Sequence, residues 1–257
     1  MFLETSFDRL FLSTVRLKTR SSNNEIVDAS AFIYIYPMEE GDFPFLVTTY
    51  SAVQRAVIGS MSFFQQLDGE FALGKPHVLD IDNFSKLWYS KDEAAHNVAI
   101  TPFLPFAKHL DKKGVSIVTQ GITEQHLPTS KSYFELSFNQ LLYYIGYPMG
   151  LWDYKNYLPI VRNAAIASLP MVNYQGNSQL LLNTTVLPGS EGSPLFESRF
   201  NDRSNPLLLG MLVPPKNSLM NDRVRMNTLE KTDMGVMIKS DYIISLMKSY
   251  LAEKEFI

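Results

Sequence analysis

The chain consists of short apolar segments separated by turn-forming residues along nearly its whole length. Residues 29–36, 45–53 and 207–213 are rich in β-branched, aromatic and aliphatic side chains. Glycine, proline and charged residues interrupt such segments roughly every ten residues, which is typical of antiparallel strands folded into barrels or sandwiches. The chain also contains 17 Phe and 13 Tyr residues, which favour strands. We therefore expect an all-β fold.

Strands are predicted from alternation and from apolar runs. Residues 9–18 alternate apolar and polar side chains and predict a first strand. Residues 55–67 and 70–73 predict short, turn-separated segments. Further strands are expected at residues 29–36, 45–53, 97–103, 141–147, 158–168, 178–186, 207–213 and 234–238. Residues 214–233 are polar, lack periodicity and predict a long exposed loop.

The C-terminal segment has a different period. Apolar side chains recur at helical spacing at Ile243, Leu246, Met247, Tyr250 and Leu251. Ser240 before them is a residue type that caps helices. The sequence therefore predicts a closing helix with one face on the body of the protein.

Composition excludes several classes of function. The formal net charge of −3 argues against nucleic acid and anionic membranes as partners. No apolar run reaches transmembrane length, no signal peptide is expected, and cytoplasm is the default location. The chain has no cysteine, no phosphate-binding glycine loop and no metal-ligand spacing, so no cofactor or metal is expected. Asp80 and Asp82 are interpreted as exposed loop acids, not as a metal or glycosidase pair.

One stretch carries a more specific pattern. Residues 188–196 form a tight turn of small residues that leads directly into an apolar strand. This stretch resembles the nucleophile turn of trypsin-like (chymotrypsin-fold) serine peptidases at the positions Gly189, Gly192, Ser193, Pro194, Leu195 and Phe196.

Other stretches resemble the bacterial-type trypsin-like peptidase domain in the expected order. They are residues 29–33, 46–48, 97–100 and 145–148. The resemblance implies two antiparallel β-barrel lobes of the six-stranded type and a C-terminal α-helix. It places the N-terminal lobe at residues 1–125, the C-terminal lobe at 126–239 and the helix at 240–257.

The same resemblance implies that all three catalytic positions are replaced. The histidine position corresponds to Ser51, the aspartate position to Asn97 and the nucleophile position to Glu191. A serine hydroxyl attacks a carbonyl only when an imidazole accepts its proton and a carboxylate orients that imidazole. Glu191 has no hydroxyl, and its charge would repel a developing oxyanion.

Neighbouring residues leave two questions open. Ser190 and Ser193 are alternative nucleophiles, although neither occupies the position of the family's serine. No histidine falls where the family's base would lie, and His96 is expected on the opposite face of a strand; the histidines are His77, His96, His109 and His126. The oxyanion-hole-like turn of Gly189, Ser190 and Glu191 could form an anion-binding nest of amides, and Glu191 could pair with Arg162.

The sequence therefore predicts a catalytically inactive peptidase homologue, a pseudoenzyme that binds a protein or peptide. The partner would bind in the cleft between the lobes, which holds the substrate in active peptidases of this family, or at the loop of residues 214–233. Strand addition to an exposed sheet edge is one possible mode. Two alternatives stay open at this point. One is an active hydrolase with a rewired site near Ser190 and Ser193, and the other is a structural subunit of a larger complex.

Overall fold

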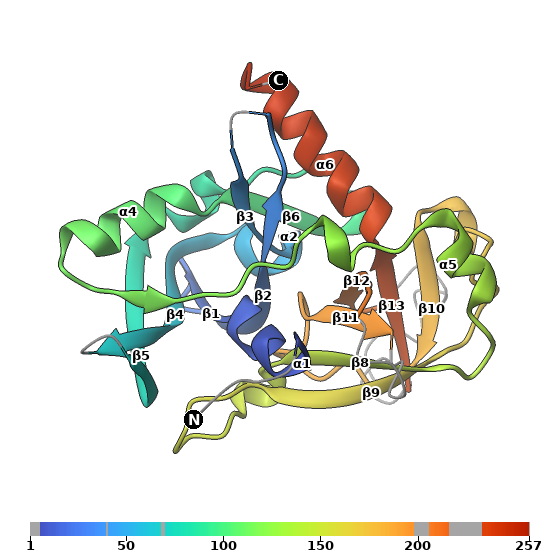
Figure 1. Ribbon diagram of the computed structural model, residues 1–257, viewed down its shortest axis with the longest axis horizontal. Coiled ribbons are helices and arrows are strands. Elements are labelled where there is room, and N and C mark those ends of the chain that lie inside the picture. The colour runs from blue at the N-terminus through green and yellow to red at the C-terminus, as the bar shows by residue number, and fades with distance from the viewer. Residues whose placement is uncertain (1–5, 40, 68–69, 198–205, 216–232, 257) are drawn as a thin grey trace.

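The computed structural model describes residues 6–256 except 40, 68–69, 198–205 and 216–232. Two antiparallel sheets lie side by side, and a C-terminal helix reaches from the second sheet to the first (Figure 1). Short helices fill the connections. The fold is therefore mostly β, as the sequence predicts.

The first sheet forms the N-terminal lobe. Its strands follow the order β5-β4-β1-β2-β3-β6, and β7 pairs with β4. Their bounds are β1 Thr14–Ser21, β2 Ile26–Tyr36, β3 Phe43–Thr49, β4 Ala56–Leu67, β5 Glu70–Asp82, β6 Val98–Pro102 and β7 Ile117–Val118. Beyond β5 the chain returns to β6 through one bridge, where Tyr89 and Ile100 exchange backbone hydrogen bonds of 2.8 and 2.9 Å. This bridge curls the sheet toward a barrel.

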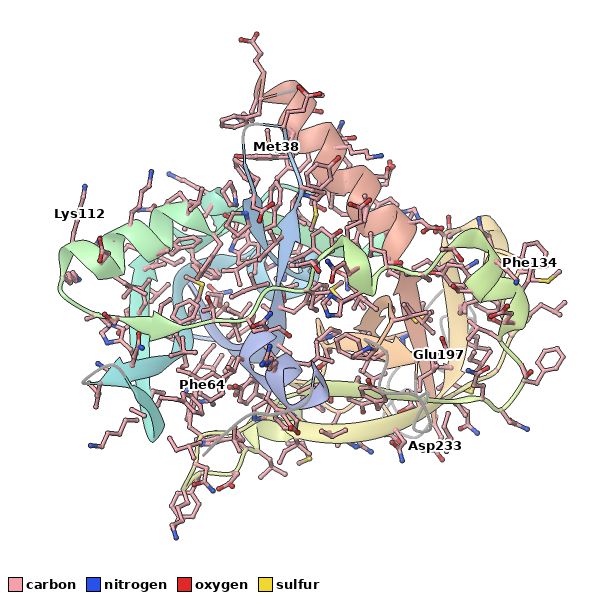
Figure 2. The ribbon with its side chains drawn as sticks, viewed as in Figure 1. Met38, Phe64, Lys112, Phe134, Glu197 and Asp233 are labelled. Atoms are coloured by element: carbon pink, nitrogen blue, oxygen red, sulfur yellow. The ribbon has the colours of Figure 1, made fainter. Side chains whose placement is uncertain are left out.

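The second sheet is a closed barrel with the order β10-β13-β12-β11-β8-β9. Its strands are β8 Leu141–Gly146, β9 Ile160–Ile166, β10 Gln179–Asn183, β11 Pro194–Glu197, β12 Leu208–Val213 and β13 Met234–Lys239. Closure leaves this lobe without free strand edges of the usual kind. Figure 2 shows Glu197 within the barrel, where its side chain is only 4% exposed, and Phe64 within the first lobe.

The helices connect and cover the two sheets. The α-helices are α1 Ser6–Leu10, α2 Tyr50–Val53, α3 Glu93–His96, α4 Leu104–Lys112, α5 Ser130–Glu135 and α6 Ser240–Glu253. The 3₁₀ helices are η1 Phe11–Ser13, η2 Phe84–Leu87, η3 Glu124–His126, η4 Pro148–Gly150 and η5 Tyr174–Gly176. The expected lobe boundary at residue 125 falls inside η3, between the last strand of the first sheet and the first strand of the barrel.

A shared apolar core joins the two sheets. It contains Phe32 and Phe45 from the first sheet, Ile145 and Phe196 from the barrel, and Leu246 from α6, all 2% exposed or less. The apolar stripe of α6 therefore packs where the two sheets meet. Separate clusters fill the interior of the first lobe and the interior of the barrel.

Several local predictions were wrong. The strand expected from residue 9 begins only at Thr14, because residues 6–13 form α1 and η1, and the Ser13 hydroxyl donates to the Leu10 carbonyl at 2.7 Å. Within the expected segment at residues 55–67, residues 56–67 form one long strand, β4, instead of short segments. Ser240 was expected to cap α6, but Lys239 occupies the N-cap position. Ser240 is the first residue of the helix, and its hydroxyl lies 3.3 Å from the Tyr133 hydroxyl.

The loop expected at residues 214–233 lies mostly outside the described residues, so its exposure stays a prediction.

Candidate functional site

Ser51 and Asn97 lie in direct contact in the first lobe. The Ser51 N–H donates to Asn97 Oδ1 at 2.8 Å, and Asn97 Nδ2 donates to Ser51 Oγ at 3.1 Å. Because a backbone N–H can only donate, it fixes which side of the Asn97 amide faces it. The structure thus brings together two residues that are 46 positions apart in the sequence.

Local structure explains how each side chain is positioned. Ser51 is exposed in the single turn of α2, directly after β3. Asn97 follows α3 in a left-handed conformation with φ 55° and ψ 42°, which asparagine tolerates better than most residues. The Asn97 carbonyl also accepts from the Tyr50 N–H at 3.2 Å, so side chain and backbone both hold the start of α2.

Neither member of this pair titrates near neutral pH. A carboxamide does not accept a proton, and a serine hydroxyl is no general base. The Asn97 amide is engaged on both sides by Ser51, through its backbone N–H and its hydroxyl oxygen. The pair can bind a polar group through the remaining donor and acceptor capacity of Ser51, but it cannot activate a nucleophile.

The stretch expected to be a tight turn is two successive β-turns over residues 187–193, which we call the Glu191 turn. Ser190 N–H donates to the Leu187 carbonyl at 2.9 Å, and Ser193 N–H donates to the Ser190 carbonyl at 3.1 Å. Gly189 and Gly192 occupy the third position of each turn with φ of 89° and 84°. A type II turn needs positive φ at that position, which explains glycine there and Pro188 before it.

Ser30 on β2 holds the Glu191 turn against the first lobe. The Ser30 N–H donates to the Glu191 carbonyl at 2.8 Å, and the Ser30 hydroxyl donates to the Gly189 carbonyl at 2.8 Å. The same hydroxyl accepts from the Tyr147 N–H at 3.0 Å. Ser30 is fully buried, so these bonds tie two carbonyls of the turn to the opposite lobe.

Gly192 brings the turn close to β3. A Cβ at this position would collide with the Ser30 carbonyl oxygen and with Thr48 Oγ1. Thr48 lies on β3 only three residues before Ser51. The Glu191 turn and the chain that carries Ser51 are therefore packed against one another.

The two candidate nucleophiles on the turn point inward. Ser190 and Ser193 are both 0% exposed. Among the described residues neither hydroxyl has a hydrogen-bond partner, so no histidine is placed to take a proton from it. A Cβ at Gly146 would collide with the Ser193 hydroxyl, which places that hydroxyl between the sheets.

Glu191 is the turn's acidic side chain, and it is half-buried. Burial raises the pKa of its carboxyl above the usual 4.5. The expected pair with Arg162 does not form. The Arg162 guanidinium instead donates to the Thr185 carbonyl at 3.3 Å and lies 5.9 Å from the Tyr144 ring centroid. Glu191 makes no ion pair with any residue in the described ranges.

The amides of the turn retain free capacity. Within the part of the chain that the structure describes, neither the Gly189 N–H nor the Glu191 N–H has a hydrogen-bond acceptor. The anion-binding nest expected from the sequence stays a prediction. The negative charge of the Glu191 carboxyl, which lies on the same turn, would repel an anion there.

The histidines lie elsewhere. His96 is in α3, not on a strand as expected, and its ring stacks on Tyr242 of α6 with centroids 3.6 Å apart. His126 Nδ1 accepts from the Thr123 N–H at 3.1 Å, and burial lowers the pKa of the imidazole. His77 lies on β5 and His109 on α4.

Two hollows were missed by the sequence reasoning. One of about 200 Å³ adjoins Ser51 and is also lined by Thr19, Glu25 and Arg55. Another of about 440 Å³ lies between α1, β2 and η3, with Arg9 and His126 in its wall. Both combine residues from distant parts of the chain, so no local sequence signal could have revealed them.

The acids Asp80 and Asp82 lie on strand β5, not in a loop. Asp80 Oδ1 accepts from the Ser60 hydroxyl at 2.5 Å across β4 and β5. Among the described residues, no group of three or more His, Asp or Glu side chains is placed to hold a metal ion. Likewise, no described helix combines the length and hydrophobicity needed to span a membrane.

The closed antiparallel barrel, the second sheet packed beside it and the C-terminal helix define the chymotrypsin-like fold of trypsin-like serine peptidases. The fold expected from the sequence is thereby confirmed. No family model and no curated protein matches the sequence.

Three solved structures illustrate the likeness. The HtrA-type protease AlgW with tripeptide has a TM-score of 0.55 at 14% identity over 99% of this chain and 65% of that one. A variant of AlgW with tripeptide has a TM-score of 0.51 at 15% identity, over 97% of this chain and 63% of that one. HL collagenase has a TM-score of 0.52 at 14% identity, over 96% of this chain and 94% of that one. The chain thus spans less than two thirds of the two AlgW chains.

Proposed function

We propose that this chain is a trypsin-like peptidase fold without peptidase chemistry, which works by binding a peptide or protein segment. The observation that carries the proposal is the Ser51–Asn97 pair, because these two residues stand where the resemblance would place the base and its orienting acid. Their mutual hydrogen bonds of 2.8 and 3.1 Å occupy the Asn97 amide and involve no titratable group. The third position of the triad would be Glu191.

The chemistry of these three residues supports the proposal. Loss of a single triad member typically lowers the rate by about four orders of magnitude. Here the base, the acid that orients it and the nucleophile would all be absent. At that position the carboxyl of Glu191 would also put a negative charge close to a developing oxyanion, which would repel it.

A rewired hydrolase is the competing function. Ser190 and Ser193 would have to serve as the nucleophile, yet both are fully buried and their hydroxyls contact no base among the described residues. Activity would require the Glu191 turn to reorganise against the hydrogen bonds of Ser30.

A serine-directed fluorophosphonate probe separates the two functions. We expect no stoichiometric labelling and no hydrolysis of casein or of fluorogenic peptides, with trypsin as the positive control in the same assay. Stoichiometric labelling that disappears in Ser190→Ala or in Ser193→Ala would establish the hydrolase and overturn the proposal.

Binding is tested separately. The full chain, used as bait in an extract of its native host, should retain a specific protein that mass spectrometry identifies, and that protein should bind again when purified. The solution mass of the chain alone and in the extract distinguishes a free binder from a subunit of a stable complex. A protein partner and a cytoplasmic location are both parts of this proposal.

A further inference from the structure

Glu191 is a carboxylate without a partner among the described residues. On the Glu191 turn the serine side chains are buried, whereas Pro188 is exposed and Leu187 and Glu191 are partly exposed. The Glu191 carboxyl is half-buried, which removes part of its hydration. An ion pair between a partly dehydrated carboxylate and a cation of a ligand is stronger than the same pair made by a fully solvated carboxylate.

Two candidate cations of the fold, Arg16 and Arg162, are already engaged. Arg16 pairs with Asp28 at 2.8 Å and lies 4.2 Å from the Trp152 ring centroid. Arg162 is held by the Thr185 carbonyl. Because both guanidinium groups have other partners, Glu191 can accept a cation that a ligand supplies.

An exposed apolar surface adjoins the same turn. The Met149 N–H donates to the Pro188 carbonyl, which fixes η4 against the turn. Met149 is 64% exposed and Leu151 is 60% exposed. Gly189, two residues before Glu191, packs directly against the backbone of Tyr147 and Met149, so this surface lies beside the turn that carries Glu191.

Charge and apolar surface together define the chemistry of a ligand. We propose that the Glu191 turn binds a peptide segment in which a lysine or arginine stands beside an apolar residue. The basic side chain pairs with Glu191, and the apolar side chain covers Met149 and Leu151. This inference rests on the proposed binding function and names the class of partner that the site takes.

Biased peptide libraries test the proposal. Octapeptide pools with Lys, Arg, Gln or Glu fixed at the centre, next to a fixed Leu, are immobilised and probed with the purified full chain. We expect the Lys and Arg pools to retain about ten times more protein than the Gln pool, and the Glu pool to retain the least. Raising the salt concentration should reduce this difference.

Substitutions assign the preference to Glu191. Glu191→Gln should abolish the preference for basic residues, and Glu191→Lys should reverse it toward the Glu pool. Glu255→Gln makes the same charge change at an exposed C-terminal position and should leave the preference intact. Met149→Ser should weaken retention of all pools that carry the fixed Leu.

Each contrary result is informative. Equal retention of all four pools, or a basic preference that survives in Glu191→Gln, overturns the inference and leaves the proposed function standing. Absence of retention on every pool also overturns it. The proposed function fails only on the separate probe-labelling and partner-capture experiments, so the two failures are distinguishable.

Discussion

At the scale of single residues, Glu191 makes the free energy of unfolding depend on pH. Burial raises the pKa of its carboxyl above 4.5 in the folded state. The folded protein therefore binds more protons than the unfolded chain between 4.5 and the folded-state pKa, and its stability falls as the pH rises through this window. The ionised carboxylate is the destabilising form.

Glu191→Gln should consequently raise the melting temperature at neutral pH. The neutral amide has the shape of the protonated acid and does not lose stability as the pH rises. The difference between variant and parent should be close to zero below pH 4.5 and grow as the pH rises through the folded-state pKa. Thermal melts from pH 4 to pH 8, with Glu255→Gln as control, measure it. A difference that is the same at every pH contradicts this prediction.

Two buried serines near the same turn should behave in opposite ways. Ser30 and Ser190 are both 0% exposed, but the Ser30 hydroxyl makes two hydrogen bonds and the Ser190 hydroxyl has no partner among the described residues. Ser30→Ala should lower the free energy of unfolding by about 1–3 kcal/mol. Ser190→Ala should leave it unchanged or raise it by up to about 1 kcal/mol. Urea denaturation of both variants measures this, and equal losses would contradict the assigned bonds.

At the scale of secondary-structure elements, α6 fastens the barrel to the first sheet. Leu246 is 2% exposed and packs in the shared core, whereas Lys248 on the same helix is exposed. Near the end of the chain, Phe256 contacts Phe43 of β3 with ring centroids 5.3 Å apart. The helix thus contacts both sheets along its length (Figure 1).

Leu246→Ala should reduce the free energy of unfolding by about 2–5 kcal/mol, because it leaves a cavity between the sheets. Lys248→Ala on the exposed side should change it by no more than about 0.5 kcal/mol. Denaturant titrations of the two variants give both values. Similar small effects for both would mean that the helix does not pack as described.

The sequence predicted these elements correctly where the spacing of apolar residues fitted only one type of secondary structure. The helical spacing from Ile243 to Leu251 predicted α6, and the apolar runs predicted the main strands. The pattern failed at Leu10 and Leu12, which are both buried but in helical turns, so alternation there indicated burial and not a strand. It also failed at His96, because the left-handed Asn97 that ends α3 leaves no trace in the alternation.

The candidate site was predictable only in part. The small residues of the Glu191 turn and the identities of Ser51 and Asn97 are visible in the sequence. The role of Ser30 is not, because its hydroxyl binds a carbonyl 159 residues away. Whether a half-buried acid is paired also depends on packing, and the expected Glu191–Arg162 pair proved wrong for that reason.

At the scale of the whole molecule, the two lobes share one core and should unfold together. Phe196 of the barrel is 0% exposed and belongs to the same cluster as Phe32 and Phe45 of the first sheet. The hydrogen bonds of Ser30 cross the same boundary. Separation of the lobes would expose this core to water, which opposes stepwise unfolding.

A cavity in the barrel should therefore also lower the stability of the first lobe. The chain has two tryptophans, and in a Trp152→Phe background only Trp88 remains, packed on Phe84 inside the first lobe. Adding Phe196→Ala should cost about 3–5 kcal/mol and move the urea midpoint down by about 1 M or more. Trp88 fluorescence and far-UV circular dichroism should report this same shift.

The control for this experiment is Phe134→Ala in the same background, since Phe134 is 65% exposed and projects from α5 away from the core (Figure 2). It should change the free energy of unfolding by no more than about 0.5 kcal/mol and so leave both urea midpoints almost unchanged. If Phe196→Ala instead produced a second transition while the Trp88 signal kept its midpoint, the lobes would be independent units. The Glu191 turn, which bridges them, could then not be held rigidly enough to present Glu191 and Met149 as one binding face.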